Sequence, residues 1–125
     1  MDALVIDDSR AMRTILGGML TDLGFRVVQA TDGRDALARL AETPAARLAL
    51  VDWNMPEMDG LAFIRAVRAD RAYEGLKLVV VSTETEQAQM ATALEAGADE
   101  YVMKPFTRAV IAEKLGLLGL PGPSA

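Results

Sequence analysis

Five residues with acidic, basic or hydroxyl side chains each follow directly on a short apolar run, and together they could perform phosphoryl-transfer chemistry. These residues are Asp7, Asp8, Asp52, Ser82 and Lys104. A carboxylate can act as a nucleophile toward phosphorus when a cation neutralises the charge on the phosphoryl oxygens. An ammonium group and a hydroxyl close by would bind the same oxygens. This chemistry requires the five side chains to converge, which depends on the elements that carry them.

The apolar runs that precede these residues are typical of strands buried on both faces, as in a parallel sheet. Residues 48–51 are continuously apolar and place Asp52 at the carboxyl end of a strand. Pro56 cannot extend that strand, and Asp59 is predicted to cap a helix over residues 61–67. In open α/β sheets, chemistry gathers at the carboxyl ends of the strands, so Asp52 has the position of a functional carboxylate.

Strands and helices alternate along the rest of the chain. Further strands are predicted at residues 4–6, 25–30, 76–81 and 101–103, each followed by a helix. The apolar spacing of these helices predicts that Ile15, Leu94 and Val110 face the core. Residues 83–86 match a capping box for the fourth helix, which is alanine-rich. We expect residues 1–120 to form one domain and residues 121–125 to be a flexible tail.

Five strand–helix pairs predict an α/β fold: a doubly wound, five-stranded parallel sheet with helices on both faces, for which the order 2-1-3-4-5 fits best. Strands 1 and 3 would then be neighbours, so Asp7, Asp8 and Asp52 would converge. Three close carboxylates repel one another unless a cation lies between them, and Mg²⁺ prefers such oxygen ligands. Lys104 and Ser82 end strands 5 and 4 on the same edge. We therefore expect a site for an incoming phosphoryl group.

The composition argues against several other classes of site. The 125 residues include 18 acidic and 13 basic side chains, a net charge of −5, and we expect no nucleic-acid binding. Because the chain has no cysteine or histidine, a bound metal would be a hard cation held by oxygens. No apolar run reaches the roughly 20 residues of a membrane span, and nothing resembles a signal peptide. We expect a monomeric, cytoplasmic protein.

The strand-end residues Asp7-Asp8, Asp52, Ser82 and Lys104-Pro105, with the block VDWNMPEMDG at 51–60, resemble the receiver domain of two-component response regulators. Within that family the chain is similar to the single-domain, CheY-like regulators of chemotaxis. The resemblance covers essentially the whole chain and implies a flavodoxin-like fold. The order 2-1-3-4-5 is also that of CheY, so it is not an independent deduction.

The resemblance implies a function for the acidic residues. Asp52 would accept a phosphoryl group from a histidine kinase. Asp8, Asp52 and the backbone carbonyl of Asn54 would ligate Mg²⁺, or Mn²⁺ in its place, with Asp7 acting through water. Lys104 would pair with the phosphoryl group, or with Asp52 when that residue is unmodified. Asn54 also matches a position that tunes hydrolysis of the acyl phosphate.

The resemblance further implies a switch. Ser82 would bind the phosphoryl oxygen and Tyr101 would turn inward, changing the face of helix 4, strand 5 and helix 5 for an output protein such as the flagellar motor switch. Thr83 and Glu84 match positions that tune dephosphorylation, and the Lys104–Pro105 bond would be cis. Ser82 stands where threonine is frequent in the family, and Thr83 where a smaller residue is frequent. Both departures bear on the lifetime of the phosphoryl group.

Each residue alone has a simpler interpretation. Asp7-Asp8 could cap a helix, Asp52 could be a partly buried ion-pair partner, and Lys104-Pro105 could be a turn. Ser82 would by default cap the following helix, and Tyr101 would be an ordinary strand aromatic. Their joint occurrence at the ends of separate strands favours the functional interpretation.

Two other functional classes share part of the pattern. A magnesium-dependent phosphohydrolase of the haloacid-dehalogenase type carries a second carboxylate two residues after its nucleophile, where this chain has Asn54, which cannot exchange a proton. A flavodoxin-like electron carrier needs a hydroxyl- and glycine-rich phosphate loop after strand 1, where this chain is acidic. We therefore predict a regulator with slow self-dephosphorylation, not an enzyme with outside substrates. A phosphorelay intermediate and a phosphate sink are alternatives to motor control.

Overall fold

The computed structural model describes residues 1–83 and 87–120. In this part of the chain, five strands alternate with five α-helices, and a short 3₁₀-helix precedes the fourth strand. The bounds are β1 Asp2–Ile6, α1 Arg10–Asp22, β2 Arg26–Ala30, α2 Gly33–Glu42, β3 Ala46–Val51, α3 Gly60–Arg68, η1 Arg71–Tyr73, β4 Lys77–Ser82, α4 Gln87–Ala96, β5 Glu100–Met103 and α5 Arg108–Leu117.

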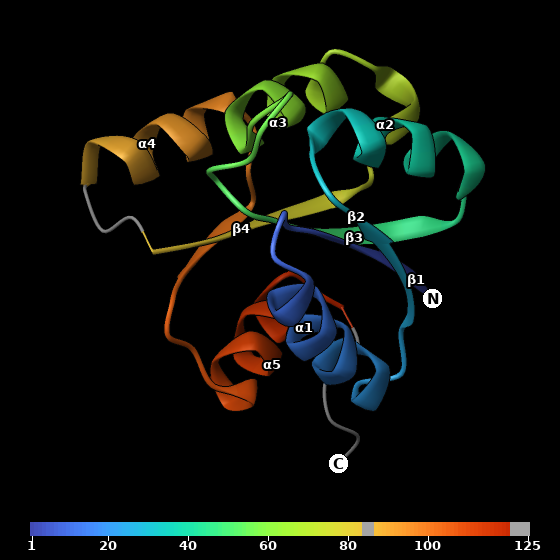
Figure 1. Ribbon diagram of the computed structural model, residues 1–125, viewed down its shortest axis with the longest axis vertical. Coiled ribbons are helices and arrows are strands. Elements are labelled where there is room, and N and C mark those ends of the chain that lie inside the picture. Colours follow the sequence, from blue (N-terminus) through green and yellow to red (C-terminus); the bar gives the residue numbers. More distant parts are fainter. Residues whose placement is uncertain (84–86, 121–125) are drawn as a thin grey trace.

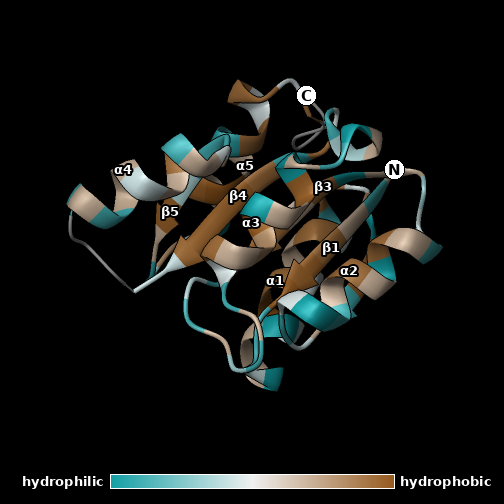
Figure 2. Cartoon of the chain, turned by 90° about the horizontal axis from the view of Figure 1, so that it is seen from above, coloured by the Kyte–Doolittle hydropathy of each residue, from teal (hydrophilic) through white to brown (hydrophobic). Residues whose placement is uncertain are grey.

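The strands form one parallel sheet in the order β2-β1-β3-β4-β5, so the predicted fold class and strand order are confirmed. Figure 1 shows α2, α3 and α4 on one face of the sheet and α1 and α5 on the other. In Figure 2 the central strands are among the most hydrophobic parts of the chain. Helices on both faces explain why these strands are apolar on both sides.

Two apolar layers flank the sheet because successive strand residues point to opposite faces. In β3, Ala49 and Val51 belong to the layer that includes Phe63 of α3, whereas Leu48 and Leu50 belong to the layer under α1 and α5. Phe63 is fully buried, as are Leu48 and Ala49. The central strands are therefore held from both sides, and their carboxyl ends have fixed positions.

Three side chains predicted to face the core are instead exposed. The exposed fraction is 48% for Ile15, 48% for Leu94 and 38% for Val110. Each lies at the margin of its helix's apolar stripe. Ile15 lines a hollow with Met12, while Leu94 and Val110 line a second hollow between α4, β5 and α5. Helical spacing predicts the direction of a stripe, but not how far the sheet beneath it extends.

Side-chain caps begin several of the helices. Asp59 accepts a hydrogen bond from the Ala62 backbone N–H at 2.9 Å, so the predicted cap of α3 is confirmed. The capping box at 83–86 cannot be compared in the same way, because Glu84, Thr85 and Glu86 lie outside the described residues, as do residues 121–125. Among the described helices, none combines the length and apolarity of a transmembrane segment.

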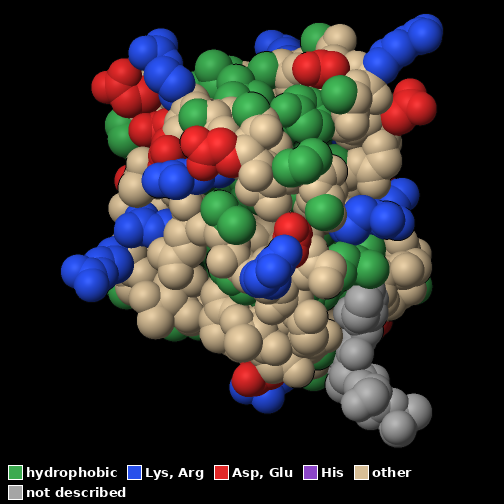
Figure 3. All heavy atoms as spheres, turned by 90° about the vertical axis from the view of Figure 1, so that its right-hand side faces the viewer, with side chains coloured by type: hydrophobic (Ala, Val, Ile, Leu, Met, Phe, Trp, Pro, Cys, Tyr) green, Lys and Arg blue, Asp and Glu red, His purple; other side chains and the backbone are tan. Residues whose placement is uncertain are grey.

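The exposed edge of the sheet at β2 lies on the side of the molecule shown in Figure 3, where Lys and Arg side chains are scattered among Asp, Glu and hydrophobic groups. One ion pair at this edge joins β2 to its neighbour: Arg26 Nε lies 3.0 Å from Asp2 Oδ1. The Arg26 side chain is 83% exposed, so this pair contributes little to stability.

Candidate metal centre

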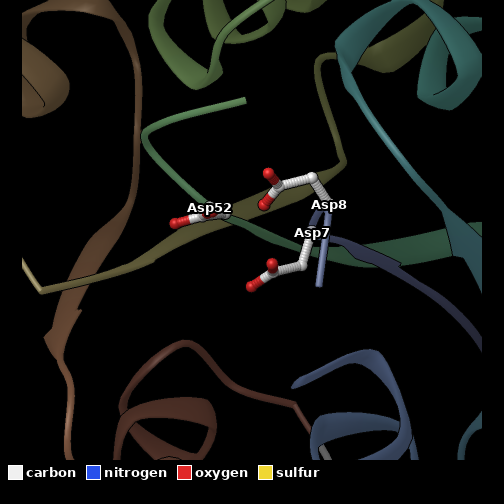
Figure 4. A group of neighbouring side chains, drawn as sticks. All are labelled: Asp7, Asp8 and Asp52. Carbon is white, nitrogen blue, oxygen red and sulfur yellow. The ribbon is translucent and has the colours of Figure 1, made fainter. Parts of the chain in front are cut away.

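Three carboxylates converge at the carboxyl end of the sheet. Asp7 and Asp8 follow β1, Asp52 follows β3, and these two strands are paired. One ligand oxygen from each of the three residues lies within 4.8 Å of the others. Figure 4 shows the three side chains directed into a common region from the two strand ends. The structure thus brings together the acidic residues that the sequence predicted to meet.

The backbone ladder of the sheet extends into this site and positions the acidic residues. The Asp52 N–H donates to the Ile6 carbonyl at 2.9 Å, and the Asp7 N–H donates to the Ala30 carbonyl at 3.1 Å. Asp7 is further held by the Ser9 N–H, which donates to Asp7 Oδ1 at 2.9 Å. Asp7 is 2% exposed and Asp52 9%, whereas Asp8 faces solvent.

Lys104 supplies the positive charge of the site. Its Nζ lies 3.2 Å from Asp7 Oδ2 and 3.6 Å from Asp52 Oδ1, and its side chain is mostly buried. Its backbone N–H donates to the Ser82 carbonyl at 2.8 Å, which joins the ends of β4 and β5. The Lys104–Pro105 peptide bond is cis, as the resemblance implied. The pair with Asp52 that the resemblance implied is therefore present, and Asp7 is a second, nearer partner.

Burial raises the pKa of Asp52 from its ordinary value of 3.8 to about 6, and the negative charge of Asp7 adds to this effect. Lys104 and the backbone N–H of Trp53 act in the opposite direction by favouring the charged form, and Asp8 adds a small increase. Asp52 is therefore ionised at pH 7 and above, but its charge is held in an unfavourable environment. A divalent cation would relieve that repulsion.

The loop from β3 to α3 turns back beneath Asp52. The Gly60 N–H donates to the Trp53 carbonyl at 3.0 Å, and a Cβ at Gly60 would lie 2.5 Å from the Asp52 carbonyl oxygen, so only glycine permits this approach. Asn54 lies at the exposed start of this loop, two residues after Asp52. Its position is compatible with the carbonyl ligand that the resemblance implied.

The remaining predicted site residues lie around this edge. Ser82 ends β4 and is 1% exposed, and Tyr101 of β5 is 6% exposed, so the tyrosine ring lies inward in this structure. Thr83 is exposed and lines a hollow together with Lys104 and Pro105. Glu84, predicted to tune dephosphorylation, lies outside the described residues.

The donor set fits a hard divalent cation. Among the described residues, the Asp7, Asp8 and Asp52 cluster is the one group of acidic side chains close enough to share an ion, and all its ligand atoms are oxygens. Magnesium prefers oxygen ligands and keeps several waters, which the exposed side of the site at Asp8 would admit.

The comparisons with known proteins agree with this geometry. Residues 3–116 match the family described as the response regulator receiver domain, and the chain belongs to this family. It is a receiver domain of the two-component signalling type.

Its relatives include a chemotaxis protein CheY homologue of Campylobacter jejuni, which is 43% identical over 92% of this chain and 89% of its own length. CheY1 of Helicobacter pylori is 40% identical over 92% of this chain and 94% of its own length. Among solved structures, the chemotaxis protein CheY4 of Vibrio cholerae superimposes with a TM-score of 0.86 at 31% identity, covering 93% of this chain and 96% of that protein.

One contact at the site was not predicted from the sequence. Arg13 of α1 donates from Nη1 to the Asp7 carbonyl at 2.8 Å and from Nε to the Gln29 side-chain oxygen at 3.1 Å. The apolar spacing of α1 gave no indication of a bond from Arg13 to the preceding loop.

Proposed function

We propose that Asp52 accepts a phosphoryl group from the phosphohistidine of a partner kinase. The observation that carries this proposal is the cluster itself: three carboxylates with ligand oxygens within 4.8 Å of one another, and an ammonium 3.6 Å from Asp52. Asp8, Asp52 and the Asn54 carbonyl would hold Mg²⁺, with Asp7 acting through water, and the ion would neutralise the phosphoryl oxygens.

The transfer requires a carboxylate nucleophile aligned with phosphorus. An Asp52 carboxylate oxygen forms a bond to phosphorus, the bond from phosphorus to the donor's imidazole nitrogen breaks, and that nitrogen keeps the electron pair. Asp52 is ionised at neutral pH because its pKa is about 6. Lys104, already 3.6 Å from Asp52, would pair with the charge that arrives on the phosphoryl oxygens.

The acyl phosphate would then shift the populations of two states of the output face. Ser82 ends β4 beside the site and would bind a phosphoryl oxygen. This would favour the inward orientation of the Tyr101 ring. The face of α4, β5 and α5 carries the exposed apolar residues Leu94, Met103 and Val110, which suit an output protein such as the flagellar motor switch. Slow self-dephosphorylation, with Asn54 and Thr83 near the acceptor, would reset the domain.

The direct test is phosphorylation by acetyl phosphate with Mg²⁺, followed by intact mass measurement. Wild type should gain the mass of one phosphoryl group, and Asp52→Asn should gain none. Asp59→Asn is the matched control because it makes the same chemical change in the same loop, and asparagine also caps helices well. A phosphoryl group that remains in Asp52→Asn would show that the acceptor is another residue.

A further inference from the structure

Arg13 links the metal-binding loop to the sheet, and we infer that it is a positioning residue for the cation site. This inference rests on the proposed function, because it concerns how the proposed Mg²⁺ ligands are held. Arg13 lies on the second turn of α1 and contacts no carboxylate oxygen of the cluster in the described residues. Its Nη1 donates instead to the Asp7 backbone carbonyl at 2.8 Å.

The hydrogen bond from Arg13 restrains the peptide unit that joins the two proposed ligands Asp7 and Asp8. The Asp7 carbonyl belongs to the peptide unit between Asp7 and Asp8, so fixing its oxygen fixes the plane from which the Asp8 side chain departs. Within the described chain, the Asp8 carboxylate accepts no hydrogen bond and forms no ion pair, and Asp8 is exposed. Its direction therefore depends on its backbone, whereas Asp7 is also held by Ser9 and Lys104.

A second hydrogen bond of Arg13 fixes the orientation of its guanidinium group. Nε donates to the Gln29 side-chain oxygen at 3.1 Å, and Gln29 lies on β2. The helix packs against this strand: Gly17 is buried, and a Cβ at Gly17 would lie 3.5 Å from the Val27 side chain, which is an ordinary contact distance. A planar guanidinium can satisfy both acceptors at once, which an ammonium on a flexible stem cannot do with the same geometry.

We therefore expect the cation affinity to fall when the two hydrogen bonds of the Arg13 guanidinium are removed. Groups that orient metal ligands from outside the coordination sphere commonly change metal affinity by about 10- to 100-fold. We expect Arg13→Gln to weaken Mg²⁺ binding by about tenfold, because the loop must then be ordered by the ion itself. Arg13→Lys keeps the charge but cannot donate to both acceptors with the same geometry, so its Mg²⁺ affinity should lie between those of Arg13→Gln and wild type.

The experiment is calorimetric titration of the full chain with MgCl₂, with folding verified for each variant by circular dichroism. Arg10→Gln is the matched control, since it removes the same charge three residues earlier on α1, from an exposed side chain. Gln29→Ala removes only the second acceptor and should weaken binding by about two- to threefold. Phosphorylation of Arg13→Gln by acetyl phosphate should recover to within about twofold of wild type when Mg²⁺ is saturating.

The outcomes separate this inference from the proposed function. Weaker binding in Arg13→Gln and unchanged binding in Arg10→Gln would support the positioning role. Equal losses in both variants would show a simple charge effect and overturn it, as would an unchanged Mg²⁺ affinity in a folded Arg13→Gln. Failure of wild type to bind Mg²⁺ would instead overturn the proposed function together with this inference.

Discussion

Replacing Asp52 by asparagine should stabilise the metal-free protein, and the gain should depend on pH. The folded-state pKa of Asp52 is about 6 against an ordinary value of 3.8, so between these pH values the folded protein keeps a proton that the unfolded chain has released. The free energy of unfolding that depends on this carboxyl therefore falls as pH rises through this window, and the loss is complete above about pH 7.

The magnitude follows from the shift, since one pKa unit corresponds to about 1.4 kcal/mol. Asparagine does not titrate, so the stability of Asp52→Asn relative to wild type should grow by about 2 kcal/mol between pH 4.5 and pH 7.5. Lys104 is not left without a partner in the variant, because Asp7 Oδ2 lies 3.2 Å from its Nζ. The variant should therefore gain nearly the whole effect of removing the buried charge.

Urea denaturation in EDTA at the two pH values, followed by circular dichroism, measures this difference. Asp59→Asn, the same chemical change on an exposed side chain, provides the control. Millimolar Mg²⁺ should close the gap at pH 7.5, because an ion that binds the folded wild type adds to its stability, while the amide variant has lost a ligand. A gap that stays constant between the two pH values, or one equally large in Asp59→Asn, would refute the reasoning.

Two further predictions concern the loops around the site. Asp8→Ala should raise metal-free stability by at most about 1 kcal/mol, since Asp8 is exposed and adds least to the pKa of Asp52. Mg²⁺ should change Trp53 fluorescence emission in wild type but not in Asp8→Ala. A lower urea midpoint for Asp8→Ala, or an equal emission change in the two proteins, would contradict these expectations. Glu57 has a φ of 65°, which a side chain disfavours, so Glu57→Gly should be more stable than Glu57→Ala by about 1 kcal/mol in urea titrations.

The sheet could be predicted from the sequence because its signal is local. Continuous apolar runs mark β3 and β4, and the alternation with helical stripes restricts the topology to a few parallel orders. Strand bounds differed by one or two residues: β3 begins at Ala46, two residues before the predicted start, and β4 includes Ser82. These end residues are less apolar, so the hydrophobic pattern gave no indication of them.

Contacts between distant segments could not be predicted. Arg68, at the end of α3, donates to the carbonyls of Tyr73, Leu76 and Gly97 and to the carboxylate of Asp99. The network ties the loop before β4 to the end of α4. A Cβ at Gly97 would lie 2.4 Å from the Arg68 side chain, so a glycine with positive φ is required there. Local sequence patterns gave no indication that Gly97 and Arg68 meet.

The residues of the candidate site could be predicted from strand ends, but the electrostatic environment of each residue depends on the three-dimensional structure. Strand order alone brings Asp7 and Asp52 together, since β1 and β3 are paired. Both carboxylates are buried, but their polar partners differ: Asp7 accepts from the Ser9 N–H and lies 3.2 Å from Lys104 Nζ, whereas burial raises the pKa of Asp52 to about 6. The implied pair between Lys104 and Asp52 is confirmed, while the shorter ion pair of Lys104 with Asp7 was not predicted, because strand order does not fix side-chain direction.

This division of environments bears on how stability and signalling are coupled. The sheet is buried on both faces and holds the Asp52 carboxylate where its charge is unfavourable, so the metal-free domain carries a local electrostatic cost at the carboxyl end of β3. In the proposed function a cation would remove that cost, and a phosphoryl group on Asp52 would replace one carboxylate charge by a larger charge that the cation and Lys104 would neutralise. Under this proposal the binding of Mg²⁺, the phosphorylation state of Asp52 and global stability would be thermodynamically linked, so a variant that alters one of them should alter the others.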